Sequence, residues 1–328
     1  MKLGKSKKHI LSDCIDAVFV VDGEMIKDNG EDSYSFSVKE DIGYISVFDG
    51  CGGIGSRKYE TYGGKSGAYI ASRACANAIY DYFGEISVSP AKITANTFPE
   101  IARALKDIFT ERLSAFDSGS RQSLIKGSLA KNFPTTMSGI LFKYEQKRYS
   151  YFFTWAGDSR GFILTPSGLT QVTKDDVNGS EDALSNLKND GNLANFISAD
   201  GRFELNHTLI KREKQSVVIT ATDGCFGYFS TPMEFEYMLL DTLIHSSSIN
   251  EWKETLNEYI LKYTGDDYTM AIAVAGFGSF KKLKKMFLKR HKILYTRYIS
   301  KLDGVTSNSL HDMWREYKKV YYRKYSGK

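Results

Sequence analysis

The chain has 328 residues, of which 42% are hydrophobic and 25% charged, and its formal net charge is +5. These proportions are typical of a globular protein and exclude a fibrous or disordered chain. Four cysteines without C-x-x-C spacing, and no cluster of histidines, exclude a disulfide framework and a zinc-binding motif. The cysteine pattern therefore fits the reducing cytoplasm, where we expect the protein to be. No run of residues approaches the ~20 apolar positions of a transmembrane helix.

The predicted elements come in clusters along the chain. The first cluster has strands and then helices, at residues 17–21, 34–38, 44–48, 66–83 and about 101–116. The second repeats that order, with strands at 139–144, 149–155, 161–164 and 217–222, helices at 232–245 and 249–263, and a strand at 269–274. Because strands and helices do not alternate, we expect an α+β fold with antiparallel sheets and helices packed outside.

Charge divides the chain near residues 276–279. Residues 279–328 carry 15 Lys plus Arg against three acidic residues, so their net charge is +12 and that of residues 1–278 is −7. We therefore expect a domain over 1–278 and a basic extension over 279–328. Within the domain, the polar and weakly periodic residues 165–215 predict a flap or surface subdomain outside the core.

Acidic residues stand beside strand ends at five places along the domain. These places are Glu31-Asp32, Asp49, Asp158, Asp223 and Asp266-Asp267, most of them next to a glycine. A carboxylate at a strand end has a rigid support, and glycine leaves room for a ligand near the backbone. Oxygen ligands suit hard ions such as Mg²⁺ or Mn²⁺. One such aspartate is most simply a turn or cap residue, but five places together predict one site.

The motifs around these residues resemble those of the type 2C, metal-dependent protein phosphatases, from about Ala17 to Ala275. In chain order they read KDNGED from Lys27, VFDGCGG, TTMSG, GDSR, ATDG and DDYT, and NFISADGRFELN also looks like the family's flap. The resemblance implies a four-layer α-β-β-α sandwich, in which helix pairs flank two packed antiparallel sheets. The helical extension would be added at the C-terminus.

The resemblance also implies hydrolysis of phosphoserine and phosphothreonine in proteins by a water activated between two Mn²⁺ or Mg²⁺ ions. Six residues would hold the ions: Glu31, Asp49, Gly50 through its carbonyl, Asp158, Asp223 and Asp266. Among them, Asp49 would bridge both ions and Asp158 would serve a weak third position. Asp32 would orient metal-bound water.

Three positions depart from the family pattern. Lys27 stands where an Arg usually grips the phosphate, and it offers a point charge instead of a bidentate fork. Cys51 replaces a His proposed to protonate the leaving group, a step that a thiol with a pKa of about 8.5 could perform. Gly227 replaces an Asp, so a third metal position would have one carboxylate ligand fewer. The expected catalytic residues are therefore Lys27, Asp32 and Cys51.

Alternatives to this interpretation start from the same residues. The departures suggest a phosphatase-fold protein that binds phosphorylated partners without hydrolysing them. The run CGGIGSR suggests instead a cysteine-dependent phosphatase, with Cys51 as nucleophile and Arg57 on the phosphate. Cys51 and Cys225 each follow Asp-Gly, and a reversible disulfide between them would make a redox switch.

The extension is predicted to be a helical hairpin. Apolar residues recur at helical spacing on both sides of Asp303-Gly304, namely Leu283, Phe287, Leu294, Tyr298 and Leu302, then Leu310, Trp314, Tyr317, Tyr321 and Tyr325. We expect it to dock through one face and to offer its basic face to an acidic protein, with anionic lipid and nucleic acid left open. Hydrolysis of a small phosphate ester should then survive its removal.

Overall fold

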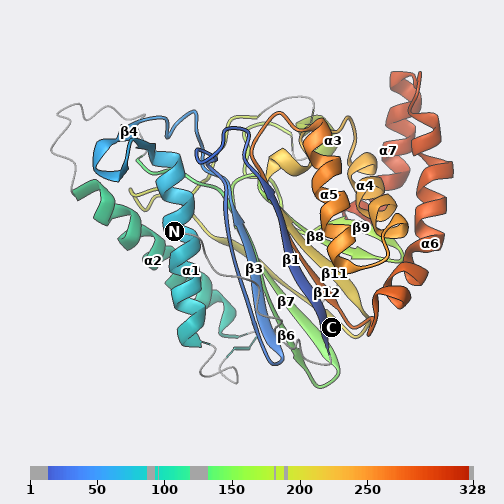
Figure 1. The fold of residues 1–328 in the computed structure, drawn as a ribbon, viewed down its shortest axis with the longest axis horizontal. Helices are drawn as coiled ribbons and strands as arrows, with labels where there is room; N and C mark the ends of the chain where they lie inside the picture. Colours follow the sequence, from blue (N-terminus) through green and yellow to red (C-terminus); the bar gives the residue numbers. More distant parts are fainter. Residues whose placement is uncertain are drawn as a thin grey trace.

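Two five-stranded antiparallel sheets pack face to face, and helices cover both outer faces (Figure 1). The computed structural model describes residues 14–86, 93–94, 96–118, 132–180, 182–187 and 191–324. This architecture confirms the predicted α+β sandwich.

The first sheet has the strand order β1-β12-β11-β8-β9, and the second has the order β10-β7-β6-β3-β2. Strands of the first sheet are β1 (Ile15–Gly23), β12 (Tyr268–Ala275), β11 (Ser216–Ala221), β8 (Arg160–Thr165) and β9 (Gly168–Gln171). Strands of the second are β10 (Asn206–Arg212), β7 (Arg148–Ala156), β6 (Met137–Glu145), β3 (Ile42–Phe48) and β2 (Ser33–Lys39). A small pair, β4 (Lys58–Tyr59) and β5 (Lys65–Ser66), stands apart.

Strand β12 shows how the sequence specifies the layers. All its side chains are buried, and they alternate between two hydrophobic clusters. Met270, Ile272 and Val274 join the cluster beneath the helices, whereas Ala271 and Ala273 join the cluster between the sheets. The period of two is that of a strand, and the small alanines let the two sheets approach each other.

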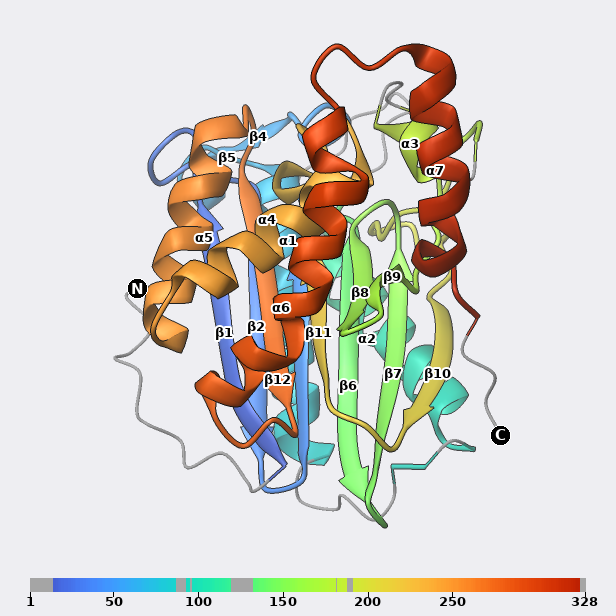
Figure 2. The same ribbon diagram turned by 90° about the vertical axis from the view of Figure 1, so that its right-hand side faces the viewer.

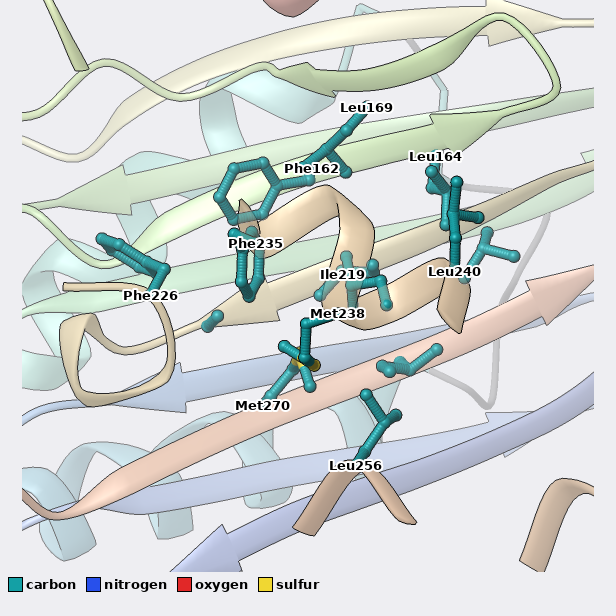
Figure 3. Close-up of a cluster of buried hydrophobic side chains, with 14 of the residues drawn as sticks. Phe162, Leu164, Leu169, Ile219, Phe226, Phe235, Met238, Leu240, Leu256 and Met270 are labelled. Atoms are coloured by element: carbon teal, nitrogen blue, oxygen red, sulfur yellow. The ribbon is translucent and has the colours of Figure 1, made fainter. Parts of the chain in front are cut away.

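Helices α1 (Gly67–Ile86) and α2 (Phe98–Ser118) cover the second sheet, and α4 (Pro232–His245) and α5 (Ile249–Tyr263) cover the first (Figure 1). Figure 3 shows the packing of α4, where Phe235 and Met238 meet Phe162, Ile219 and Met270 of the sheet. None of the described helices has the length and apolar character needed to cross a membrane.

Residues 165–215 are not a flap throughout, which corrects the expectation from sequence. Strands β9 and β10 lie in this stretch and form one edge of each sheet, where Leu169 and Ile210 are buried. Edge strands are short and often carry polar residues, so the alternation of apolar and polar residues along them is weak. Between them lie the short helix α3 (Ala183–Asn186) and loops.

The extension forms the predicted helical hairpin, with α6 (Phe280–Arg297), the 3₁₀ turn η4 (Ile299–Lys301) and α7 (Ser307–Tyr321). Most of the predicted stripe joins the cluster beneath α4 and α5, through Leu283, Phe287, Leu294, Tyr298, Trp314, Tyr317 and Tyr321. Leu302 and Leu310 are half-buried, and Tyr325 lies outside the described residues. In Figure 2, α6 lies beside α4 and α7 lies beside the edge strand β9.

The hairpin is attached by more than apolar contacts. Arg290 donates two hydrogen bonds, of 2.6 and 2.7 Å, to the carboxylate of Glu236 on α4, which is completely buried. The Tyr317 hydroxyl donates to the same carboxylate at 2.7 Å. Removing the hairpin would break this buried network and expose the aromatic stripe. The packing therefore argues against our expectation that hydrolysis survives deletion of the extension, and the domain boundary at 278 stays a prediction.

Candidate functional site

The acidic residues gather at one end of the sandwich. Strand pairing sets Ser33 opposite Phe48, and Ala221 opposite both Arg160 and Met270. The residues just outside these strand ends are Glu31-Asp32, Asp49, Asp158, Asp223 and Asp266-Asp267. The fold thus brings together the acidic residues that sequence reasoning selected.

Electrostatics show that these carboxylates act on one another. Burial raises the pKa of Asp49 well above its usual value, and Asp223 and Asp32 raise it further. Burial and Asp223 raise the pKa of Asp158 to about 8, and the same two causes raise that of Asp266 to about 6. Within the described residues, Asp49, Asp158 and Asp266 form no ion pair with a basic side chain. The site therefore concentrates negative charge that a cation would neutralise.

Hydroxyl and backbone donors hold the side chains of Glu31, Asp32 and Asp267. The Thr222 hydroxyl donates to Asp32 at 2.8 Å, and the Ser66 hydroxyl donates to Glu31. Asp267 accepts from the backbone N–H of Glu31 at 2.7 Å, so it fixes the loop before β2. Sequence reasoning assigned no role to these supporting groups. Thr222 and Asp267 do lie inside the ATDG and DDYT motifs, whereas Ser66 carried no signal.

Two further motifs support the backbone at Asp49. Its carbonyl accepts from the Thr135 hydroxyl at 2.7 Å and from the Thr136 N–H at 2.8 Å. The Thr136 hydroxyl in turn bonds the Ser159 hydroxyl at 2.7 Å. The TTMSG and GDSR motifs thus meet beneath the acidic cluster.

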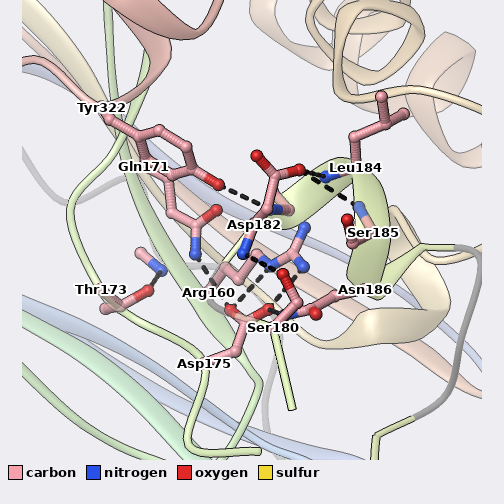
Figure 4. Close-up of polar contacts among 12 residues, drawn as sticks. Arg160, Gln171, Thr173, Asp175, Ser180, Asp182, Leu184, Ser185, Asn186 and Tyr322 are labelled. Atoms are coloured by element: carbon pink, nitrogen blue, oxygen red, sulfur yellow. Dashed lines mark hydrogen bonds and ion pairs between the residues drawn. The ribbon is translucent and has the colours of Figure 1, made fainter. Parts of the chain in front are cut away.

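A buried ion pair anchors the loop that carries Asp158. Arg160 donates to both oxygens of Asp175, at 2.9 and 2.6 Å, and Gln171 and Asn186 donate to the same carboxylate (Figure 4). Burial opposes ionisation, but Arg160 and these donors lower the pKa of Asp175. A bidentate pair of this kind fixes both partners in orientation.

Two glycines in the motifs are required by close backbone approach. A Cβ on Gly50 would lie 2.7 Å from the Ala68 carbonyl oxygen, and one on Gly224 would lie 2.0 Å from the Asp267 carbonyl oxygen. Real Cβ atoms do not approach backbone so closely, so any larger residue would push these segments apart. The close approach keeps the loops of Asp49 and Asp223 against their neighbours.

Lys27 is exposed, on the loop between β1 and β2. Two other basic residues lie beside the same loop. Lys65 donates to the Asp28 carbonyl and, at 2.9 Å, to the Asn29 side chain. Burial and the charge of Asp267 raise the pKa of Glu31, whereas the positive charge of Arg73 lowers it. Sequence reasoning assigned Lys65 and Arg73 no role at the site, because neither lies in a motif of the family.

Cys51 is half-buried beside the acidic cluster. Burial, together with Asp49, raises the pKa of its thiol well above the usual value. Its carbonyl accepts from Gly55 N–H at 2.8 Å, so one of the amides that a phosphate cradle needs is already used. Arg57 lies over the Tyr59 ring, 5.1 Å from its centroid. The loop therefore lacks the arrangement of a cysteine-dependent phosphatase.

The disulfide switch is not supported either. Within the described residues, no disulfide joins any of the four cysteines. Cys225 is completely buried, and burial raises the pKa of its thiol. A buried, protonated thiol is a poor partner for disulfide exchange.

The donor set is chemically suited to a hard divalent ion, because it consists of carboxylates and backbone carbonyls. As the side chains stand, however, no three His, Cys, Asp or Glu residues in the described part of the chain are arranged to coordinate one ion. Metal binding therefore belongs to the proposal below.

Fold and site together define a class of protein, a sandwich of two antiparallel sheets between helix layers with an acidic site at one end. The family model described as Protein phosphatase 2C matches residues 27–261, and the chain belongs to this family. None of the curated proteins compared with the chain gives a significant match.

Solved structures show the same fold. Serine/threonine phosphatase Stp1 from Staphylococcus aureus aligns with a TM-score of 0.60 at 13% identity, over 83% of this chain and 99% of its own. A bacterial serine phosphatase aligns with a TM-score of 0.59 at 15% identity, over 80% of this chain and 98% of its own. The catalytic domain of the phosphatase PstP, in complex with two manganese ions, aligns with a TM-score of 0.53 at 17% identity, over 80% of this chain and 99% of its own.

Proposed function

We propose that the protein is a metal-dependent phosphatase that hydrolyses phosphoserine and phosphothreonine in proteins. The observation that carries this proposal is the gathering of mutually repelling carboxylates at one end of a fold of this family. The manganese ions in the PstP structure support a two-ion site.

Asp49, Asp223 and Asp266 would hold one ion, with Asp49 shared by a second ion that Glu31 and the Gly50 carbonyl help to hold. When bound, two divalent ions supply an activated water and neutralise phosphate charge. Asp32, fixed by Thr222, would orient that water.

A third ion position at Asp158 would remain weak. Its loop is fixed by Arg160, but Gly227 supplies no carboxylate at the other expected ligand position. A Cβ there would lie 2.9 Å from the Asp223 carbonyl oxygen, so the loop itself is built around glycine. We therefore assign catalysis to the two-ion core.

Lys27 would hold the substrate phosphate as a point charge. Replacing Lys27 with Arg should lower the KM for a phosphopeptide by roughly 3- to 10-fold, because a guanidinium donates two parallel hydrogen bonds. Lys27→Ala should raise it. Steady-state kinetics check this result, with Lys262→Arg, an exposed position on α5, as the control. A KM unchanged in both Lys27 variants would remove Lys27 from the site.

Replacing Cys51 distinguishes the two-ion mechanism from a mechanism in which Cys51 is the nucleophile. Cys51→Ser should retain substantial manganese-dependent hydrolysis, because a thiol whose pKa is raised by burial and carboxylates is not the attacking group. Initial rates of phosphate release, with manganese and with chelator, measure the effect. Full activity of the wild type in chelator, together with an inactive Cys51→Ser variant, would establish the cysteine mechanism instead.

A protein that binds phosphorylated partners without hydrolysis is the second candidate. It is motivated by the departures at Lys27, Cys51 and Gly227. A second reason is that no three acidic, His or Cys side chains of the described residues are placed to coordinate one metal ion. Every position assigned to the two-ion core keeps its oxygen ligand, which favours catalysis. Binding of a phosphopeptide without phosphate release, at any manganese concentration, would favour the second candidate.

The outer face of α6 would recruit the substrate. Exposed lysines line it, at Lys281, Lys282, Lys285, Lys289 and Lys292. Such a cluster attracts acidic surfaces, and we propose an acidic protein partner ahead of anionic lipid or nucleic acid. Retention on immobilised polyglutamate should fall after Lys285→Glu and Lys289→Glu, and unchanged retention would count against this role.

A further inference from the structure

A cavity of about 570 Å³ lies at the open edge of the sandwich, between the end of α7 and the edge strands β9 and β10. Figure 2 shows α7 beside these two strands. The volume falls within the range of small-molecule sites, about 300–1,000 Å³. None of the residues that line it belongs to the acidic cluster of the candidate active site.

Gln171 forms a fixed part of the wall of this cavity. Gln171 is only 7% exposed, and its amide nitrogen donates to Asp175 at 3.0 Å (Figure 4). That bond fixes the orientation of the amide in the wall.

The charge of the cavity selects an anion. Lys174, Arg323 and Lys324 line it and are exposed. Asp182 is the single acidic residue among the described lining residues, and its carboxylate is already engaged. It caps α3 and accepts from the Trp314 indole at 2.9 Å. The excess of positive charge therefore faces the cavity.

The remaining walls suit a flat ring. Val172 and Ile210 provide apolar surface, and the Tyr322 ring stands at the rim. The backbone N–H of Ala183 donates to the Tyr322 hydroxyl at 2.6 Å, and Trp314 packs edge-on against the ring at 5.9 Å. An aromatic face held in place on two sides is a preformed stacking surface for a base.

We propose that this cavity is a binding site for a nucleoside monophosphate. The phosphate lies against Lys174, Arg323 and Lys324, and the base stacks on Tyr322. The site is separate from the candidate active site but shares a residue with its support, because Gln171 and Arg160 bind the same carboxylate of Asp175.

Calorimetric titration of the full chain with AMP tests this proposal. Chelator is present throughout, so that no divalent ion can hold phosphate at the acidic cluster. We expect one AMP per chain and an affinity at least ~10-fold weaker in the Lys174→Ala/Arg323→Ala variant, because charge-assisted bonds to the phosphate are lost. Thr208→Trp, which fills the cavity from β10, should abolish binding. Lys319→Ala, an exposed position on α7, is the matched control.

Melting curves confirm that each variant is folded, and a variant that does not fold is replaced in the comparison by Lys324→Ala. Adenosine and inorganic phosphate should each bind at least ~10-fold more weakly than AMP, because each lacks half of the contacts. The proposal is overturned by three results: no AMP binding at millimolar concentration, equal affinity in the cavity variants and in Lys319→Ala, or inorganic phosphate or hexaglutamate binding as tightly as AMP.

Discussion

Asp49→Asn is expected to reduce manganese-dependent hydrolysis of a phosphothreonine peptide by more than about 100-fold, and Asp223→Asn should do the same. Loss of a supporting group at a metal site typically costs about 10- to 100-fold, and loss of a charged ligand should cost more. Phosphate release measures the activity, and calorimetry with Mn²⁺ measures the loss of metal affinity.

Stability separates loss of a ligand from loss of the fold. Asp49 lies among carboxylates that raise its pKa, so replacing it with a neutral isostere removes repulsion. The melting temperature of the metal-free variant should therefore equal or exceed that of the wild type. Asp107→Asn, an exposed position on α2, is the control. Wild-type Mn²⁺ affinity in both the Asp49 and Asp223 variants would contradict the assigned ligands.

Arg290→Ala should destabilise the protein by about 3–5 kcal/mol, because it leaves the buried carboxylate of Glu236 without its partner. Glu236 is completely buried and accepts both Arg290 bonds. For a protein of this size the melting temperature should fall by on the order of 10 °C. Thermal and denaturant unfolding measure the change.

Two variants make this test specific. Lys289→Ala alters the adjacent exposed residue of α6 and should change the melting temperature little. Glu236→Gln combined with Arg290→Met removes both charges and should recover part of the loss. An Arg290→Ala protein as stable as Lys289→Ala would show that the hairpin is a loosely attached appendage.

Local periodicity was enough to predict the helices and the central strands. Helices α4 and α5 begin and end at the predicted residues, and in the structure the side chains of Thr231 and Ser248 cap their starts. Strand β9 has only four residues and pairs with the neighbouring β8, so it is too short to show a period. Strand β10 was missed because its pairing is decided by a partner distant in sequence. In β10, for example, Asn206 pairs with Trp155. An edge strand has only one neighbour to reveal it.

At the site, the sequence predicted which acidic residues gather but not what holds them. The bond from Thr222 to Asp32 spans 190 residues, and that from Glu31 N–H to Asp267 spans 236. Such contacts leave no trace in local spacing. Arg290 is a different case: from sequence it is one of the 15 basic residues of the extension, yet packing places it in the buried stripe with Phe287 and Leu294.

Phosphate release from a phosphothreonine peptide, followed with added manganese and with chelator, tests the central claim most directly. We predict release that requires manganese, stops in chelator and resumes when excess manganese is restored. Equal release in chelator, or none at any manganese or magnesium concentration from a folded protein, would contradict the assignment of a metal-dependent phosphatase.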